Sequence, residues 1–290
     1  MSAIVVDHLT KRFGQKVAVD RLSVDVARGE TVVLWGANGA GKTTVMRCIL
    51  GLIPYEGAIR VCDLDAQRDG KAVRRLIGYV PQELGLAGDP TVEELLLFYA
   101  RLRRVQISRA MYGLEHWQLD RVKQQPVRTL SGGMKQKLAL AIALVSDPPV
   151  LLLDEPTSNL DVKTRGELSA LVERLKREGK TLLLCSHRVS EVVKLADRVI
   201  VLEEGRRVEE GALEDVRNAL MRDVLIGIVV PAAQRQKAAS VLQQHGFSVQ
   251  VNGVQLWVSL GRERKIEPLQ CLLDADISVL DFEVESNHGR

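Results

Sequence analysis

The residues with the clearest chemical meaning form a glycine-rich turn between an apolar strand and an apolar helix. Residues 35–44 read WGANGAGKTT and follow the apolar run 31–34. Four residues separate Gly36 from Gly41, and Lys42 and Thr43 follow directly. Glycines let backbone N–H groups approach a polyphosphate, lysine adds positive charge, and a threonine hydroxyl can bind Mg²⁺. Taken alone, the turn could also be a structural glycine turn beside a surface lysine.

Two carboxylates follow a second apolar run. Residues 150–153 are Val-Leu-Leu-Leu, and Asp154 and Glu155 come directly after them. A strand that is apolar throughout is typical of the centre of a parallel sheet, where functional residues lie at the carboxyl end. Asp154 can then hold Mg²⁺ and Glu155 can polarise an attacking water. Acids at a strand end can also be simple helix caps.

Three more segments place polar groups at strand or helix ends. Gln82 follows a strand that ends at Pro81, and His187 follows the strand 181–185. Ser131 is a suitable helix cap, and the glycines at 132 and 133 leave N–H groups open to an anion. Each of these residues is unremarkable alone: the histidine could be a surface or core residue, an isolated glutamine indicates nothing, and the serine could be only a cap at a flexible helix entry.

Phe13 precedes Gly14 ahead of the glycine-rich turn. An aromatic ring here could stack on an adenine base, since a flat π face recognises a base with little hydrogen bonding. Packing into the core is the alternative for a lone phenylalanine.

The elements that must position these groups are those of an α/β fold. Apolar periodicity predicts an antiparallel edge sheet from strands at 3–6 and 16–26, and a helical insertion at about 83–130 within the α/β core. Further strands are expected at 58–64, 76–80, 150–153, 181–185, 199–202 and 207–209, with helices at 45–53, 95–104, 110–122, 162–177 and 213–221.

The pattern restarts near residue 223. The order of expected elements is βαββαβ, the ferredoxin-like arrangement, with the hairpin signal Asn252-Gly253 between the middle strands. We therefore expect two domains, residues 1–221 and an accessory domain at 222–290. The second has no catalytic constellation, which favours a dimer-stabilising or regulatory role.

Composition excludes several classes of protein. The 40 Lys and Arg nearly balance the 37 Asp and Glu, giving a net charge of +3. So small an overall charge gives no reason to expect nucleic-acid binding. The four cysteines form no CxxC pair, which argues against a metal site and favours a reducing compartment. No signal peptide and no apolar run of about 20 residues is present, so a membrane function would need a partner that supplies the span.

Together these motifs, across about residues 3–217, resemble the ATPase subunit of ATP-binding-cassette (ABC) transporters. Six motifs occur in the family's order: GANGAGKTT as Walker A, Gln82 of the Q-loop, LSGGM as the signature, LLLDEP as Walker B, SNLD as the D-loop, and His187 as the switch histidine. The signature matters most, because other ATPases with a Walker A motif lack it.

The resemblance implies a head-to-tail homodimer that holds two ATP molecules, each between one copy's Walker A and the other's signature. It implies that Glu155 is the general base, that His187 contacts the γ-phosphate, and that Gln82 senses the metal. Thr43, Gln82 and Asp154 would hold Mg²⁺. The ATP-binding residues would be Phe13, Gly36, Asn38, Gly39, Ala40, Gly41, Lys42, Thr43, Thr44, Ser131, Gly132, Gly133 and Asp161.

The resemblance also implies an integral-membrane permease as partner and a place on the cytoplasmic face of the cell membrane. Met134, Lys135 and Lys137 after the signature look more like multidrug or antibiotic exporter subunits than importers. An importer ATPase is the alternative, followed by a soluble ABC-type ATPase acting on ribosomes or nucleic acid. The single cassette and the absence of a strongly basic tract argue against the last.

Overall fold

The computed structural model describes residues 1–82, 89–157, 160, 162–187, 195–212, 215–216, 224–252, 255–260 and 264–286. The chain divides into two compact units, Met1–Leu213 and Glu214–Arg290. The boundary expected between residues 221 and 222 falls in 217–223, outside the described residues, as does most of the helix expected at 213–221.

A six-stranded sheet forms the centre of the first unit, in the order β10-β9-β3-β8-β7-β6. β3 is parallel to both β8 and β9, and β7 is parallel to β8 and β6, while β10 is antiparallel to β9. Every residue of β3, β7 and β8 is buried, because helices or a second sheet cover both faces. The bounds are β3 Thr31–Trp35, β6 Ile77–Val80, β7 Val150–Asp154, β8 Thr181–Ser186, β9 Arg198–Glu203 and β10 Arg206–Gly211.

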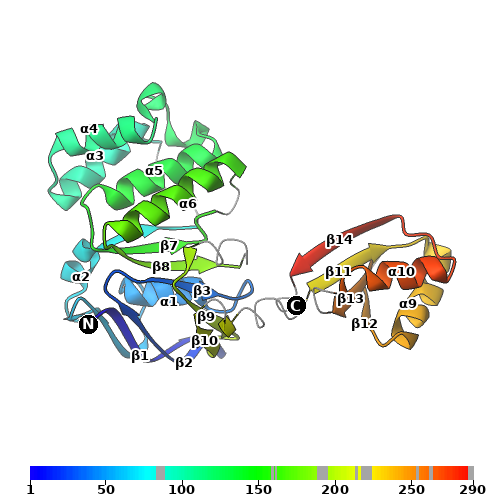
Figure 1. The fold of residues 1–290 in the computed structure, drawn as a ribbon. Coiled ribbons are helices and arrows are strands. Elements are labelled where there is room, and N and C mark those ends of the chain that lie inside the picture. The colour runs from blue at the N-terminus through cyan, green and yellow to red at the C-terminus, as the bar shows by residue number, and fades with distance from the viewer. Residues whose placement is uncertain are drawn as a thin grey trace. The chain divides into compact units, whose positions relative to one another are not determined.

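An antiparallel sheet, β2-β1-β4-β5, packs against one face through helix α1, Lys42–Ile49 (Figure 1). Buried residues of this sheet, such as Ile4 and Val6, share one hydrophobic core with α1 and the parallel strands. The strands are β1 Ser2–Phe13, β2 Lys16–Ala27, β4 Glu56–Val61 and β5 Leu64–Asp65, so β1 is longer than predicted. Helix α2, Gly70–Leu76, precedes β6 and was not predicted from the sequence.

Helices form the other layer, with α5 and α6 above β7 and β8 and with α3 and α4 beyond them (Figure 1). Helix α3, Val92–Arg103, begins with a capping box in which Thr91 and Glu94 satisfy each other's backbone N–H groups. The others are α4 Ile107–His116, α5 Gly132–Leu144 and α6 Val162–Arg177, with short 3₁₀ turns at Asp120–Val122 and Val127–Thr129. Among the described residues, no helix has the length and apolarity to cross a membrane.

The second unit has the expected ferredoxin-like order. Its antiparallel sheet runs β12-β13-β11-β14, and α9 and α10 pack on the face that carries Ile226, Ile228 and Leu256. The bounds are β11 Val224–Val229, α9 Arg235–Gln244, β12 Ser248–Asn252, β13 Gln255–Leu260, α10 Glu267–Asp274 and β14 Asp281–Ser286, with a 3₁₀ turn at Ala232–Gln234. β12 and β13 pair as the predicted hairpin, although Gly253 lies outside the described residues.

Candidate functional site

The glycine-rich turn joins β3 to α1 and folds around the lysine ammonium. Gly41 caps α1 with a φ of 101°, and a Cβ there would lie 2.5 Å from the carbonyl oxygen of Ala18. A Cβ on Gly36 would collide with the carbonyl of Leu202. Lys42 Nζ donates to the carbonyls of Gly36 at 2.7 Å and Ala37 at 2.9 Å. Both glycines are required because the backbone passes close to neighbouring strands.

Asp154 lies at the end of β7 with its two carboxylate oxygens bonded to different elements. Thr43 Oγ1 donates to Oδ1 at 3.1 Å, and the hydroxyl of Tyr79 donates to Oδ2 at 3.4 Å. The residue is 1% exposed. Burial raises its pKa, which the hydrogen bond from Thr43 partly opposes. Burial also raises the pKa of Tyr79, so the phenol remains a donor.

The carboxylate of Glu155 contacts three other residues that were predicted to belong to the site. Lys42 Nζ lies 3.6 Å and His187 Nδ1 lies 3.3 Å from its Oε1, and Gln82 Nε2 donates to its Oε2 at 3.3 Å. Contact with His187 lowers the pKa of Glu155 by more than burial raises it. Its φ of 47° is unusual for a residue with a side chain. Glu155 is therefore a buried, ionised carboxylate on a residue with a strained backbone conformation.

These contacts test whether Mg²⁺ fits the residues present. The hydroxyl of Thr43 and the carboxylate of Asp154 are hard oxygen donors 3.1 Å apart, the ligand types that Mg²⁺ takes beside a nucleotide. A buried carboxylate without a full counter-charge also favours a cation. The donor set fits. Gln82, the third residue expected at the metal, contacts Glu155 through its amide nitrogen, and its place at the metal stays a prediction.

The signature residues lie in the helical layer. Ser131 caps α5 by accepting a hydrogen bond from the backbone N–H of Met134 at 3.3 Å, as predicted. Ser131 and Gly132 are exposed, whereas Gly133 packs near Thr164. The described contacts within one chain do not bring these residues to Lys42 or Glu155. The start of α5 is thus a helix N-terminus open to an external anion.

The remaining predicted residues surround the turn. Phe13 ends β1 and is 50% exposed, with Lys11 Nζ 4.8 Å from its ring centroid. Core packing, the alternative for this ring, does not describe a side chain that is half exposed. Asn38 and Gly39 are exposed, Ala40 is buried, and Thr44 is half-buried on α1. Asp161 and the preceding Ser-Asn pair lie outside the described residues.

Sequence reasoning missed Tyr79. The residue was read only as part of an apolar strand, and nothing in its neighbourhood signals a contact with Asp154. Cys185 was likewise read only as an apolar strand residue, yet it also contacts the Asp154 carboxylate and its thiol pKa is raised by burial. The pairing of β6, β7 and β8 creates both contacts, so no local pattern could have revealed them.

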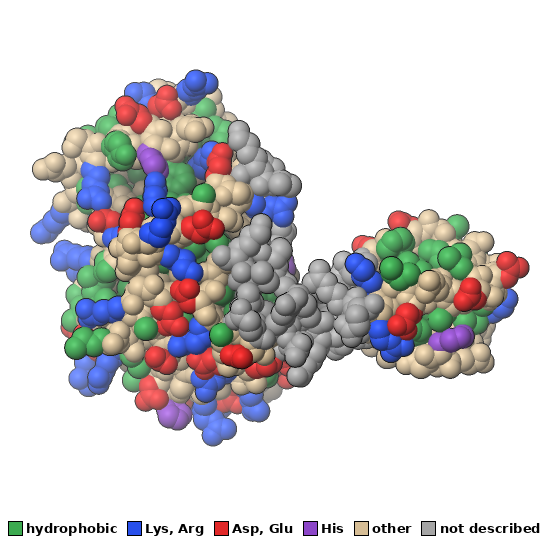
Figure 2. All heavy atoms as spheres, viewed as in Figure 1, with side chains coloured by type: hydrophobic (Ala, Val, Ile, Leu, Met, Phe, Trp, Pro, Cys, Tyr) green, Lys and Arg blue, Asp and Glu red, His purple; other side chains and the backbone are tan. Residues whose placement is uncertain are grey.

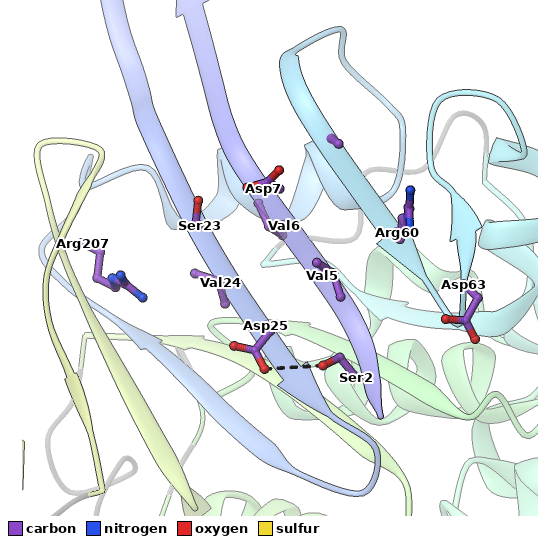
Figure 3. A pocket seen from close by; sticks show the side chains of 11 residues that line it. Ser2, Val5, Val6, Asp7, Ser23, Val24, Asp25, Arg60, Asp63 and Arg207 are labelled. Carbon is purple, nitrogen blue, oxygen red and sulfur yellow. Dashed lines mark hydrogen bonds between the residues drawn. The ribbon is translucent and has the colours of Figure 1, made fainter.

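A groove of about 510 Å³ lies on the outer face of the antiparallel sheet, away from these residues (Figure 3). It carries Asp7, Asp25 and Asp63 together with Arg60 and Arg207, and none of the predicted site residues. Figure 2 shows positive and negative side chains interspersed over the visible face of the first unit. Positive and negative side chains thus lie close to one another on that face, as their nearly equal numbers in the sequence allow.

Comparison with known proteins finds relatives in one family. Residues 19–158 match the ABC transporter family. Nod factor export ATP-binding protein I of Paraburkholderia xenovorans is 43% identical over 216 residues, which cover 73% of this chain and 71% of that protein. A solved ATP-binding subunit of an ABC transporter superposes with a TM-score of 0.70 at 28% identity, over 75% of this chain and 93% of that one. A dimeric bacterial ABC transporter cassette gives a TM-score of 0.67 at 27% identity, over 72% and 98%. The resemblance drawn from the six motifs is confirmed, and the chain belongs to the ABC transporter ATP-binding proteins, as the subunit that binds and hydrolyses ATP for a transporter.

Proposed function

We propose that two copies of this chain pair head to tail around two ATP molecules and thereby drive a separate membrane permease. The exposed N-terminus of α5 at Ser131 supports this pairing, because its free N–H groups suit the γ-phosphate of an ATP held by the partner copy. The existence of a dimeric cassette with the same fold also supports it. ATP would then join the two copies, and its hydrolysis would release them.

Within each copy, the glycine-rich turn would bind the phosphates. Lys42 would transfer its hydrogen bonds from the carbonyls of Gly36 and Ala37 to phosphate oxygens. Thr43 and Asp154 would hold Mg²⁺, which neutralises phosphate charge when bound. Phe13 would stack on adenine, since its ring is half exposed at the end of β1, in the β1–β2 hairpin that contacts Gly41.

Glu155 would act as the general base, and the convergence of Lys42, His187 and Gln82 on its carboxylate is the observation that carries this assignment. A base must be ionised and must point at the position of the water. The lowered pKa keeps Glu155 ionised, and contacts to both oxygens fix its direction. His187 would pass from this carboxylate to the γ-phosphate, and Gln82 would report the state of the site to the helical insertion that follows it.

Export is the favoured direction of transport. The name of the Paraburkholderia relative describes an export system. Independently, Met134, Lys135 and Lys137 of this chain follow the signature and resemble the exporter pattern. The permease would hold the chain at the cytoplasmic face of the membrane. The second unit would be an accessory domain, residues 222–290, that stabilises or regulates the dimer. Co-purification from membranes with a permease tests this assignment, and isolation with ribosomes or nucleic acid instead would contradict it.

Glu155→Gln is the sharpest test of the proposed mechanism. We expect ATP to bind with Mg²⁺ while kcat falls by roughly 10² to 10⁴, the usual loss for a positioned base. The ATP complex should persist as a dimer, measured by light scattering after size exclusion, with phosphate release measured in parallel. Glu178→Gln, at the exposed position just after α6, is the matched control and should behave as wild type. Undiminished turnover in Glu155→Gln would remove this residue from the role of base.

A further inference from the structure

Strand β6 brings two side chains to the site, and only one of them belongs to a motif. Gln82, just beyond the strand, contacts Glu155, and Tyr79 within the strand contacts Asp154. We propose that Tyr79 is a positioning residue, which fixes the Asp154 carboxylate in the orientation that binds Mg²⁺. The inference rests on the proposed function in one respect, namely that Asp154 holds the metal.

Sheet register explains how the phenol reaches the carboxylate. Tyr79 pairs with Leu152 across the parallel strands β6 and β7. Asp154 lies two residues beyond Leu152, so both side chains point to the same face of the sheet. Two residues span roughly 6.6 Å along a strand, a distance that a tyrosine ring and its hydroxyl can cover. The ring packs against the core cluster that contains Leu152, which restricts its rotation.

The two oxygens of Asp154 are held by donors of different kinds. Thr43 donates to Oδ1 and is itself expected to bind the metal, whereas Tyr79 donates to Oδ2 from outside the pair of metal-binding residues. A carboxylate turns easily about its last bond, because that torsion has a broad energy minimum. The Cys185 thiol also contacts this carboxylate, but a thiol is only a weak donor, so Thr43 and Cys185 together would leave Asp154 free to rotate. With Tyr79 as well, both oxygens are fixed before the metal arrives.

Hydrogen bonds to a metal-binding side chain raise metal affinity in proteins, because they hold that side chain in its binding orientation before the metal arrives. The role needs the hydroxyl and not the ring, so Tyr79→Phe isolates it. Tyr55→Phe is the matched control. Tyr55 packs against the same core cluster, and its hydroxyl makes no hydrogen bond to the Asp154 carboxylate.

The experiment uses the full chain and a fluorescent, non-hydrolysable ATP analogue. Nucleotide affinity is measured by fluorescence in EDTA and again during titration with Mg²⁺, and thermal unfolding of the nucleotide-free proteins checks the fold. We expect Tyr79→Phe to raise the Mg²⁺ concentration for half-maximal effect by about 10-fold, the low end of the range for such hydrogen bonds because this bond is long. Affinity in EDTA should stay at the wild-type value, which a merely disturbed core would not preserve.

The outcomes separate the inference from the function on which it rests. An unchanged Mg²⁺ midpoint in Tyr79→Phe, with normal Mg²⁺ dependence in wild type, would overturn the role of Tyr79 alone. An equal shift in Tyr55→Phe would mean that general core packing causes the effect, and would also overturn it. Wild-type nucleotide binding that ignores Mg²⁺ would remove the metal site itself, and the proposed function with it.

Discussion

The two units of this chain differ in whether they bury polar side chains. In the described residues, every buried polar or charged side chain belongs to the first unit, including Lys42, Asp154 and Glu155. Among the described residues of the second unit, the buried ones are apolar. Burying a charge is costly unless it is paired, so a protein retains such groups where they are used. The contrast assigns chemistry to the first unit and packing to the second.

The glycines of the two units also serve different purposes, ligand binding in the first unit and packing in the second. Gly36 and Gly41 leave room for the backbone of neighbouring strands, which lets the phosphate-binding turn close around Lys42. Gly227, in β11 of the second unit, leaves room for the indole of Trp257, whose nearest ring atom would lie 2.9 Å from an added Cβ. One residue type thus makes a ligand-binding loop in one unit and a packing contact in the other.

Lys42→Ala should have the largest effect among changes that test this contrast. Charge-assisted hydrogen bonds contribute about 1.5–3 kcal/mol, so ATP affinity should fall by roughly 10- to 100-fold. Isothermal titration calorimetry measures this. Lys180→Ala is the control, since Lys180 forms a close ion pair with Asp147 away from the site. An equal loss in Lys180→Ala would show that general charge, and not the site, determines affinity.

Gly227→Ala should affect only the second unit. The added Cβ would press on the Trp257 ring and destabilise this unit by about 1–3 kcal/mol, as overpacking does. Hydrogen exchange of β11 and β13 amides should rise while ATP affinity stays constant. Gly166→Ala in α6, where an added Cβ meets open space, should instead stabilise its helix by about 0.5–1 kcal/mol.

The independence of the units can be tested further with a fragment that ends near Arg222, which should still fold and bind ATP. Loss of ATP binding in Gly227→Ala, or failure of this fragment to fold, would show that the two units depend on each other.

Asp154→Asn should give the smallest change, an increase in stability of the nucleotide-free protein. Because burial raises the folded-state pKa of Asp154, its ionised form costs stability, and this cost grows as pH rises through the window above 3.8. Asparagine removes the charge and keeps an acceptor for Thr43. Each kcal/mol gained raises the melting temperature by roughly 2–4 °C in a unit of this size. A melting temperature that fails to rise at neutral pH would contradict the desolvation argument.

Much of the site was predictable because its motifs are local. The phosphate-binding turn, the two acids at the end of β7 and the cap at Ser131 each depend on residues adjacent in sequence, and the structure has each at the predicted strand or helix end. Their convergence was expected only in outline, since parallel strands share one carboxyl edge. Which atoms meet was not predictable: the contact between the Gln82 amide and the Glu155 carboxylate appears only in the structure.

The fold class, the ferredoxin-like second unit and the family could be predicted from the sequence, because they depend on periodicity, turn chemistry and spacing along the chain. The hydrogen bond from Tyr79 to Asp154 and the packing of Trp257 over Gly227 could not be predicted from the sequence and are known from the folded chain. Both contacts join residues far apart in sequence, and the register of neighbouring strands alone brings them within reach.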